Sequence, residues 1–176
     1  MPSREQLHKY QERMINFIYN TPKCALWAGL GLGKTITTLT AIVDLIDSMT
    51  VSKVLIVAPL RVANSVWHKE AANWQHTKHL KFSIVTGSEK ERLAALHKTA
   101  DVYVINRENV SWIVEHYAKK WPFDMIVLDE ASSFKSASSQ RFKSLRKTIP
   151  FTNRLVELTG TPSPNGLLDI WSQMYL

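Results

Sequence analysis

The chain has 176 residues, of which 45% are hydrophobic and 21% are charged, a composition typical of one globular domain with a substantial core. No apolar run approaches the roughly 18 residues that span a bilayer, and the polar first residues do not resemble a secretory signal, so we expect no membrane partner. A net charge of +7 favours a polyanionic partner only weakly, since many basic domains bind none.

The chain contains one cysteine, Cys24, which excludes an internal disulfide. A chain without disulfides suits a reducing compartment. We therefore predict a cytoplasmic location.

Stretches with helical and with strand-like hydrophobic patterns alternate along the chain. The first stretch, 7–19, places Gln11 among apolar residues on one helical face and predicts a helix. We predict strands at the apolar runs 23–28, 53–59, 81–87, 101–106, 124–130 and 153–161. We predict the remaining helices at 36–46, 62–74, 88–96, 107–120, 139–149 and 166–176.

Strands rich in Val, Ile and Leu that alternate with helices predict a mainly parallel central sheet with helices on both faces. No internal repeat, low-complexity stretch or obvious linker interrupts the pattern. We therefore expect residues 1–176 to form a single α/β domain.

A glycine-rich segment lies between a predicted strand and a predicted helix, where Gly29, Gly31 and Gly33 precede Lys34 and Thr35. Glycine gives up the most backbone freedom on ordering, so this density of glycines calls for a functional reason. A backbone without Cβ atoms can wrap phosphate oxygens with its N–H groups, and the following helix adds its positive N-terminal end. In such a loop the lysine would reach the β- and γ-phosphates of a nucleotide, and the threonine hydroxyl would hold Mg²⁺.

The strict phosphate-loop pattern is not met, because Ala28 stands where G-x-x-x-x-G-K-[ST] requires glycine. The alternative interpretation is a glycine-rich turn with an incidental lysine. The position of the segment between a strand and a helix favours the phosphate loop.

Two acidic residues, Asp129 and Glu130, follow the apolar run from Met125 to Leu128. The carboxyl ends of strands form the edge at which open α/β sheets bind ligands. Adjacent residues of an extended segment point in different directions, so Asp129 can hold Mg²⁺ through its water shell while Glu130 orients and deprotonates the attacking water. The alternative is an ordinary acidic strand end, and the accompanying phosphate loop favours the functional interpretation.

These motifs resemble those of superfamily 2 helicases and translocases, and within them the Swi/Snf-like branch. "AGLGLGKT" is similar to motif I, which accepts alanine at its first position, and "DEAS" resembles motif II, with Ser132 where the branch more often has histidine. "LTGTP" resembles motif III, "VAPLRVANSVWHKEAANW" resembles motif Ia, and "LHKYQ" resembles the glutamine motif. The resemblance runs from about residue 7 to the end. It implies a RecA-like P-loop NTPase domain of compact bacterial or phage type.

The resemblance also implies roles for individual residues at a nucleotide site. Lys34, Asp129 and Glu130 are expected to act in the hydrolysis of ATP, with Mg²⁺ held by Thr35 and Asp129. Gln11 is expected to read the adenine edge, although a partly exposed boundary glutamine is the alternative. The expected nucleotide-binding residues are Gln11, Ala28, Gly29, Leu30, Gly31, Leu32, Gly33, Lys34 and Thr35.

Motif III is expected to link the hydrolysis site to nucleic acid and to a second domain, through Thr159, Gly160 and Thr161. The alternative for this segment is a capped turn, because Thr-Gly-Thr-Pro is good turn chemistry. A basic run at 134–147 is similar to a basic segment of the branch, although a charge run is more often a solvated face.

Two further strand ends are expected to face a nucleic-acid backbone, as motifs Ia and Ib do in the family. A phosphate contact needs only a donor, so several polar residues qualify, and solvated loop residues are the alternative. The candidates are Arg61, Asn64, Asn106 and Arg107.

Together the motifs predict the ATP-binding half of a DNA-dependent ATPase that couples Mg-ATP hydrolysis to translocation on, or remodelling of, duplex DNA. We expect contacts to DNA that do not depend on sequence, a second RecA-like domain, weak turnover by this chain alone, and a bacterial or phage-infected host cytoplasm. The choice of DNA rather than RNA depends on the resemblance. A strand-separating DNA or RNA helicase, and a nucleotide-gated binding module without turnover, remain as alternatives.

Overall fold

A computed structural model of the chain describes residues 1–27, 33–129 and 139–159. Six strands form one sheet in the order β1-β6-β5-β2-β4-β3, and every neighbouring pair is parallel. The strands are β1 (Lys23–Trp27), β2 (Val54–Ala58), β3 (Phe82–Val85), β4 (Val102–Asn106), β5 (Met125–Asp129) and β6 (Arg154–Thr159). The predicted parallel α/β architecture is therefore confirmed.

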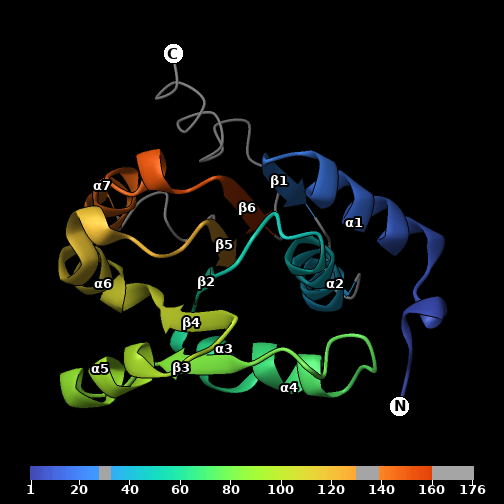
Figure 1. Cartoon of the computed structure of the whole chain (residues 1–176), viewed down its shortest axis with the longest axis horizontal. Helices are drawn as coiled ribbons and strands as arrows, with labels where there is room; N and C mark the ends of the chain where they lie inside the picture. The colour runs from blue at the N-terminus through green and yellow to red at the C-terminus, as the bar shows by residue number, and fades with distance from the viewer. Residues whose placement is uncertain (28–32, 130–138, 160–176) are drawn as a thin grey trace.

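Helices cover both faces of the sheet (Figure 1). They are α1 (Lys9–Asn20), α2 (Lys34–Asp47), α3 (Leu60–Ser65), α4 (Trp67–Ala72), α5 (Glu89–His97), α6 (Val110–Tyr117) and α7 (Ser139–Arg146). The strand order moves in one direction from β1 through β2 to β3, and in the opposite direction from β3 through β4 and β5 to β6. Because crossovers between parallel strands are right-handed, the reversal puts α2, α3 and α4 on one face and α5, α6 and α7 on the other.

The core accordingly consists of two hydrophobic clusters, one on each face of the sheet. Successive residues of β2 alternate between them: Val54 and Ile56 pack with α1, α2 and α4, whereas Leu55 and Val57 pack with α5, α6 and α7. All five residues of β2, β4 and β5 are buried. This continuous burial explains why these strands appear in the sequence as unbroken apolar runs.

The helix predicted at 62–74 is instead a pair of short helices. It begins earlier, at Leu60 after Pro59, and it is interrupted at Val66 between α3 and α4. The hydroxyl of Ser65 donates to the carbonyl of Arg61 at 2.6 Å, a local bond that often bends a helix. Because of this interruption, the orientation of α4 is not determined by that of α3.

Other boundaries differ from prediction by a few residues. The helix expected at 107–120 begins and ends with 3-10 turns, η2 (Arg107–Asn109) and η3 (Ala118–Lys120), and α7 ends before η5 (Ile149–Phe151). Another 3-10 turn, η1 (Arg4–Gln6), precedes α1. The helix predicted at 166–176 lies outside the described residues.

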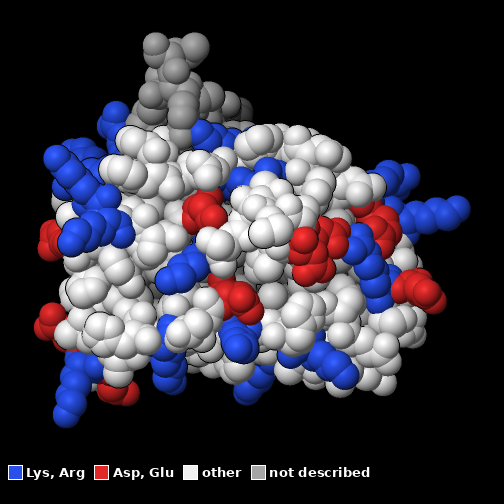
Figure 2. All heavy atoms as spheres, viewed as in Figure 1, with Lys and Arg blue, Asp and Glu red and all other residues white. Residues whose placement is uncertain are grey.

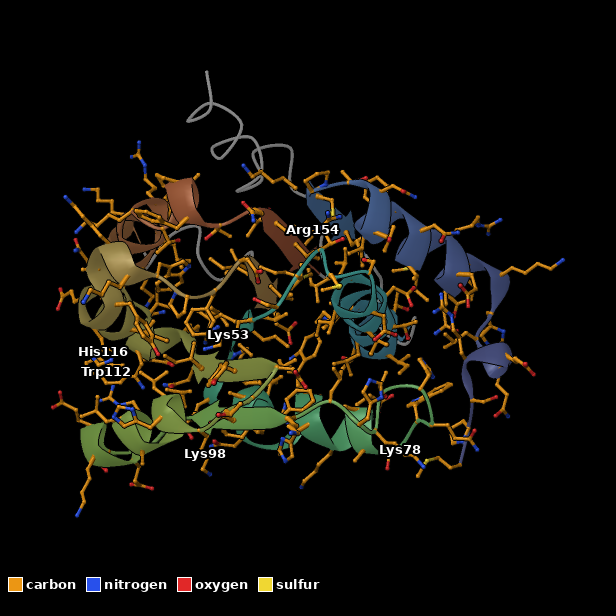
Figure 3. The ribbon with its side chains drawn as sticks, viewed as in Figure 1. Lys53, Lys78, Lys98, Trp112, His116 and Arg154 are labelled. Carbon is orange, nitrogen blue, oxygen red and sulfur yellow. The ribbon has the colours of Figure 1, made fainter. Side chains whose placement is uncertain are left out.

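Hydrogen bonds from an arginine side chain join α1 to β6, the last described strand. Arg154, labelled in Figure 3, donates from Nη2 to the carbonyls of Ile18 and Tyr19 at the end of α1, at 2.9 and 2.5 Å. The Ile18 carbonyl also accepts from the backbone N–H of Thr21 at 3.4 Å, and the guanidinium adds a charged donor to both carbonyls at this helix end. The contact holds α1 against β6 and thereby fixes the helix that carries Gln11.

Every helix that the structure describes falls short of the length and apolarity needed to cross a bilayer. The sole cysteine, Cys24, is buried in β1. Burial raises the pKa of its thiol to about 11, so the thiol stays protonated near neutral pH and does not supply a nucleophile.

Candidate functional site

Because the strands are parallel, their carboxyl ends meet along one border of the sheet, which we call the carboxyl edge. Strand order divides this edge into two halves. The half formed by β1, β6 and β5 adjoins the start of α2, and the half formed by β2, β4 and β3 adjoins α3 and η2. Of the predicted nucleotide residues that the structure describes, Lys34, Thr35 and Asp129 lie on the first half, and the predicted nucleic-acid residues lie on the second.

α2 is preceded by a glycine whose backbone conformation residues with a side chain rarely adopt. Gly33 is the residue before α2 and has φ of +67°, a left-handed conformation. A Cβ atom at this position would lie 2.5 Å from Nε2 of Gln11. The amide of Gln11 is thus packed directly against the end of the glycine-rich segment.

Gln11 is 7% exposed, and its Oε1 accepts a hydrogen bond from the backbone N–H of His8 at 2.8 Å. His8 is the residue before α1, so this bond also caps the start of that helix. The sequence indicated that the buried Gln11 amide needs a hydrogen-bond partner, but it did not indicate that the backbone N–H of His8 is one. The amide lies against the glycine before α2, where an adenine reader is expected.

Lys34 and Asp129 lie together at the carboxyl edge, as their motifs predict. Nζ of Lys34, in the first turn of α2, is 3.6 Å from Oδ1 of Asp129, at the end of β5. The side chain of Asp129 is 5% exposed and that of Lys34 is 27% exposed. A buried carboxylate is stabilised by such a cation, and the lysine stays accessible to an anion from the solvent side.

Thr35 differs from the other threonines of α2. Thr37, Thr38 and Thr40 donate their hydroxyls to backbone carbonyls four residues earlier, at 2.7 to 2.9 Å. The Thr35 hydroxyl makes no hydrogen bond to any residue within the described ranges. A hydroxyl and a carboxylate are the hard oxygen ligands that Mg²⁺ prefers, so Thr35 and Asp129 fit the predicted ion.

The second oxygen of Asp129 has a partner that the sequence did not reveal. Oδ2 accepts a hydrogen bond from the indole N–H of Trp67 at 3.0 Å. Trp67 begins α4 and is completely buried. The spacing of apolar residues indicates that this tryptophan is buried, but no local pattern indicates which acceptor its single donor meets.

A hydrogen-bonded network occupies the carboxyl end of β4. Asn106 is 6% exposed, its Oδ1 accepts from Nδ2 of Asn109 at 2.7 Å, and its Nδ2 donates to Glu108 at 2.9 Å. Burial acts to raise the pKa of Glu108, but bonds from its own backbone N–H and from Asn106, with the charges of Arg107 and Arg141, lower it overall. Asn106 thus makes hydrogen bonds within the turn that follows β4. Its contact with a nucleic-acid phosphate stays a prediction.

Arg61, Asn64 and Arg107 are more accessible. Arg61 and Asn64 are exposed on α3, where Asn64 accepts a hydrogen bond from the Thr86 hydroxyl after β3 at 2.7 Å. Arg107 is partly exposed and lies 3.5 Å from Glu108. These side chains are placed together on the second half of the carboxyl edge, and their binding of phosphates stays a prediction.

Basic side chains also gather over α6 and α7, at the upper left of the face in Figure 2. The basic residues of this region include Lys119, Lys120, Lys143 and Arg146. Acidic residues are interspersed over the rest of this face, so the molecule has no uniform positive surface here. Within the described residues, part of the basic run lies on α7, and whether it is a solvated face or contacts DNA stays a prediction.

Thr159 ends β6 beside Trp27 of β1 and is partly buried. Several predicted site residues lie outside the described residues, and their roles stay predictions. They are Ala28, Gly29, Leu30, Gly31, Leu32, Glu130, Gly160 and Thr161.

Comparisons with known proteins agree with the resemblance. The SNF2-related domain family matches residues 10–176. Protein p41 of Acyrthosiphon pisum secondary endosymbiont phage 1 is 41% identical over 173 residues, which is 94% of this chain and 38% of that protein. The DNA excision repair protein ERCC-6-like of Mus musculus is 31% identical over 181 residues, 96% of this chain and 14% of that protein.

The fold is similar to a solved one, the Sulfolobus solfataricus SWI2/SNF2 ATPase core in complex with dsDNA. The TM-score is 0.77 at 23% identity, and the match covers 96% of this chain and 35% of that one. The RecA-like fold expected from the sequence is thereby confirmed. This chain spans well under half of each of these proteins, and the family match over residues 10–176 shows that it belongs to the SNF2-related domain family, the Swi/Snf-like branch of superfamily 2.

Proposed function

We propose that this chain is the ATP-binding half of a DNA-dependent ATPase that couples Mg-ATP hydrolysis to translocation on, or remodelling of, duplex DNA. The observation that carries the proposal is the approach of Lys34 to Asp129, 3.6 Å apart, beside the glycine that Gln11 contacts. A cation at a helix N-terminus and a carboxylate at a strand end are the parts that phosphoryl transfer requires.

Each residue of the site has a task in this proposal. Lys34 would neutralise the β- and γ-phosphates, and Thr35 and Asp129 would hold Mg²⁺. Mg²⁺, when bound, would neutralise the charge that develops on the transferred phosphoryl group. Glu130 would orient and deprotonate the attacking water, and Gln11 would read the adenine edge.

The DNA part of the proposal is supported by the relatives. One is a DNA excision repair protein, and the archaeal core was solved with double-stranded DNA. The exposed Arg61 and the partly exposed Arg107 offer donors to phosphates without reading bases, which favours binding that does not depend on sequence. A cytoplasmic location in a bacterium or a phage-infected cell is part of the proposal, and the phage relative supports it.

We propose further that a second RecA-like domain completes the site by supplying an arginine to the transferring phosphoryl group. Such an arginine acts on charge that appears only in the transition state, and it accelerates related reactions roughly 10³- to 10⁵-fold. The experiment compares phosphate release by this chain and by a longer chain that includes a second domain, each with and without duplex DNA. The Lys34→Ala chain serves to detect contaminating hydrolases.

We expect slow release by residues 1–176 and release stimulated by duplex DNA in the longer chain. Rapid, DNA-stimulated release by residues 1–176 alone would overturn the two-domain mechanism. Release that duplex DNA leaves unchanged in the longer chain would overturn the proposed DNA dependence.

Substitution of Arg61 by alanine should weaken binding to duplex DNA about equally for unrelated sequences. The side chain is exposed on α3, and loss of one phosphate contact should reduce the slope of log K against log salt by about 1. The measurement is a salt titration of DNA binding by fluorescence anisotropy, with duplexes of different sequence.

Lys98→Ala is the matched control for charge. Lys98 is exposed at the amino-terminal side of β4, on the border opposite the carboxyl edge (Figure 3). Its loss removes one positive charge and should leave the salt slope unchanged. Equal effects of the two substitutions would assign DNA binding to net charge, and an effect confined to one sequence would refute readout through phosphates.

A further inference from the structure

We propose that Trp67 is a positioning residue for Mg²⁺, whose indole N–H fixes the Asp129 carboxylate in the orientation that holds the ion. This inference rests on the proposed function, and it adds a residue that touches neither the nucleotide nor the ion. The resemblance placed Trp67 within motif Ia and gave it no role at the nucleotide.

The contacts of Asp129 divide its two oxygens between two tasks. Oδ2 accepts the Trp67 N–H at 3.0 Å, and Oδ1 lies 3.6 Å from Nζ of Lys34. The terminal side-chain torsion of an aspartate, χ2, takes a broad range of values when no contact restrains the carboxylate. A donor fixed on one oxygen therefore determines where the other oxygen points, which here is toward the first turn of α2.

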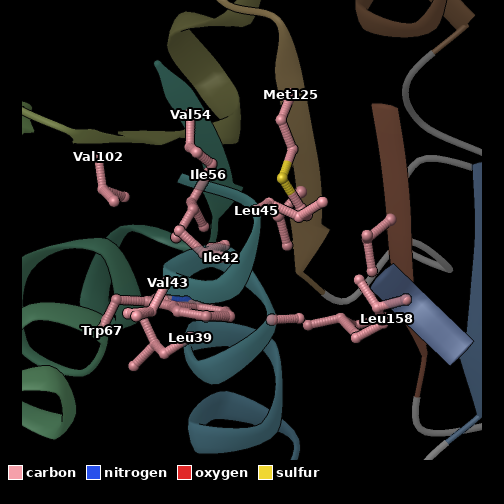
Figure 4. Packing of buried hydrophobic residues seen from close by; sticks show 14 of the residues in the cluster. Leu39, Ile42, Val43, Leu45, Val54, Ile56, Trp67, Val102, Met125 and Leu158 are labelled. Carbon is pink, nitrogen blue, oxygen red and sulfur yellow. The ribbon is translucent and has the colours of Figure 1, made fainter. Parts of the chain in front are cut away.

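Trp67 can act as such a donor because its own position is fixed by packing. The residue is 0% exposed and belongs to the cluster that includes Leu39 and Val43 of α2. Figure 4 shows the Trp67 ring lying beside these two residues. The ring thus contacts α2, which carries Lys34 and Thr35, while its N–H bonds to the end of β5.

This geometry links the two elements that supply the ion's ligands. The separation between Thr35 on α2 and Asp129 on β5 depends on what lies between them, and the Trp67 side chain is packed against one and bonded to the other. An outer partner that orients a metal ligand typically contributes 10- to 100-fold to metal affinity. Trp67→Phe would remove the donor and keep an aromatic ring in the core.

The experiment is a calorimetric titration of ADP into the chain, with Mg²⁺ and again with a chelator in its place. For Trp67→Phe we expect the gain in ADP affinity that Mg²⁺ provides to fall about 10-fold. The affinity without metal should change by less than about two-fold, because the phosphate contacts of Lys34 remain. Loss of core packing alone would change the affinities for ADP with and without Mg²⁺ by similar factors.

Trp74→Phe is the matched control, because Trp74 also donates its indole N–H to a carboxylate. Its partner is Glu70, at 3.1 Å, and neither residue contacts Asp129. We expect this substitution to leave both affinities unchanged. Retention of the full Mg²⁺-dependent gain in Trp67→Phe would overturn the inference, whereas failure of the unsubstituted chain to bind Mg-ADP would overturn the proposed function itself.

A second measurement uses the unsubstituted chain and applies even if Trp67→Phe does not fold. In ¹⁵N-labelled protein the indole N–H of Trp67 should exchange slowly with solvent, because it is buried and bonded. Its resonance should shift when Mg²⁺ is added to the ADP complex, and the Trp74 resonance should shift less. A Trp67 resonance that does not respond to Mg²⁺ would contradict the inference.

Discussion

Lys34→Ala should lower the affinity of the chain for Mg-ATP about 100-fold while leaving the fold intact. The ammonium group lies in the first turn of α2, 27% exposed, and 3.6 Å from a carboxylate. Charge-assisted contacts of one group to a phosphate are worth about 3 kcal/mol at most, which corresponds to this factor. Because Asp129 is buried, loss of its cation should lower the stability, while the hydrogen bond from Trp67 to its other oxygen remains.

Isothermal calorimetry measures the affinity, and thermal unfolding measures the stability of each variant. Lys53→Ala is the control, because Lys53 precedes β2 at the border opposite the carboxyl edge and lies over the Tyr103 ring, 5.9 Å from its centre (Figure 3). We expect this variant to bind Mg-ATP normally. Equal affinities of Lys34→Ala and the unsubstituted chain would refute the assignment of the phosphate loop.

Gly33→Ala should reduce both the affinity for ATP and the preference for ATP over GTP. Gly33 has φ of +67°, and a side chain in this conformation costs about 1 to 3 kcal/mol. The added Cβ would lie 2.5 Å from Nε2 of Gln11, so the amide must move. Because its Oε1 is bonded to the backbone of His8, the displacement also disturbs the start of α1.

Gly87→Ala separates backbone strain from the effect on the site. Gly87 also has a positive φ, +88°, and the atoms nearest to its added Cβ would be those of the Glu91 carboxylate, at 3.0 to 3.1 Å. Both variants should be destabilised, as thermal unfolding will show. Only Gly33→Ala should bind ATP more than 10-fold more weakly, with its ATP-to-GTP affinity ratio closer to one. An unaltered ratio would contradict adenine reading by Gln11.

Much of the fold could be predicted from the sequence because its signals are local. Unbroken apolar runs indicated the buried strands, and the helix predicted at 88–96 begins at a cap in which the Ser88 hydroxyl accepts from the Glu91 N–H at 3.2 Å. The meeting of Lys34 and Asp129 followed from strand–helix alternation, since parallel strands bring their carboxyl ends together. The interruption at Val66 was missed because the apolar spacing continues through it, while the bond that bends the helix involves Ser65.

The partners of individual side-chain hydrogen bonds could not be predicted in this way. Trp67 was expected to be buried, but its acceptor on β5 depends on how α4 is turned after the interruption. Asn106 resembled an exposed donor at a strand end, but it is buried and accepts a hydrogen bond from Asn109. Hydrogen bonds of this kind depend on side-chain geometry in three dimensions, which neither periodicity nor spacing describes.

The position of β1 in the sheet has a consequence for the order in which the molecule assembles. Within the described residues β1 pairs only with β6, which begins at Arg154. A ribosome adds roughly 5 to 20 residues per second, so the nascent strand waits on the order of ten seconds for its neighbour. During that interval Cys24 and Leu26 have no strand beside them, whereas β2, β3 and β4 can already pair with one another. The half of the edge that holds Lys34 and Asp129 is therefore the last part of the sheet to be completed during synthesis, because β1 joins the other strands only through β6.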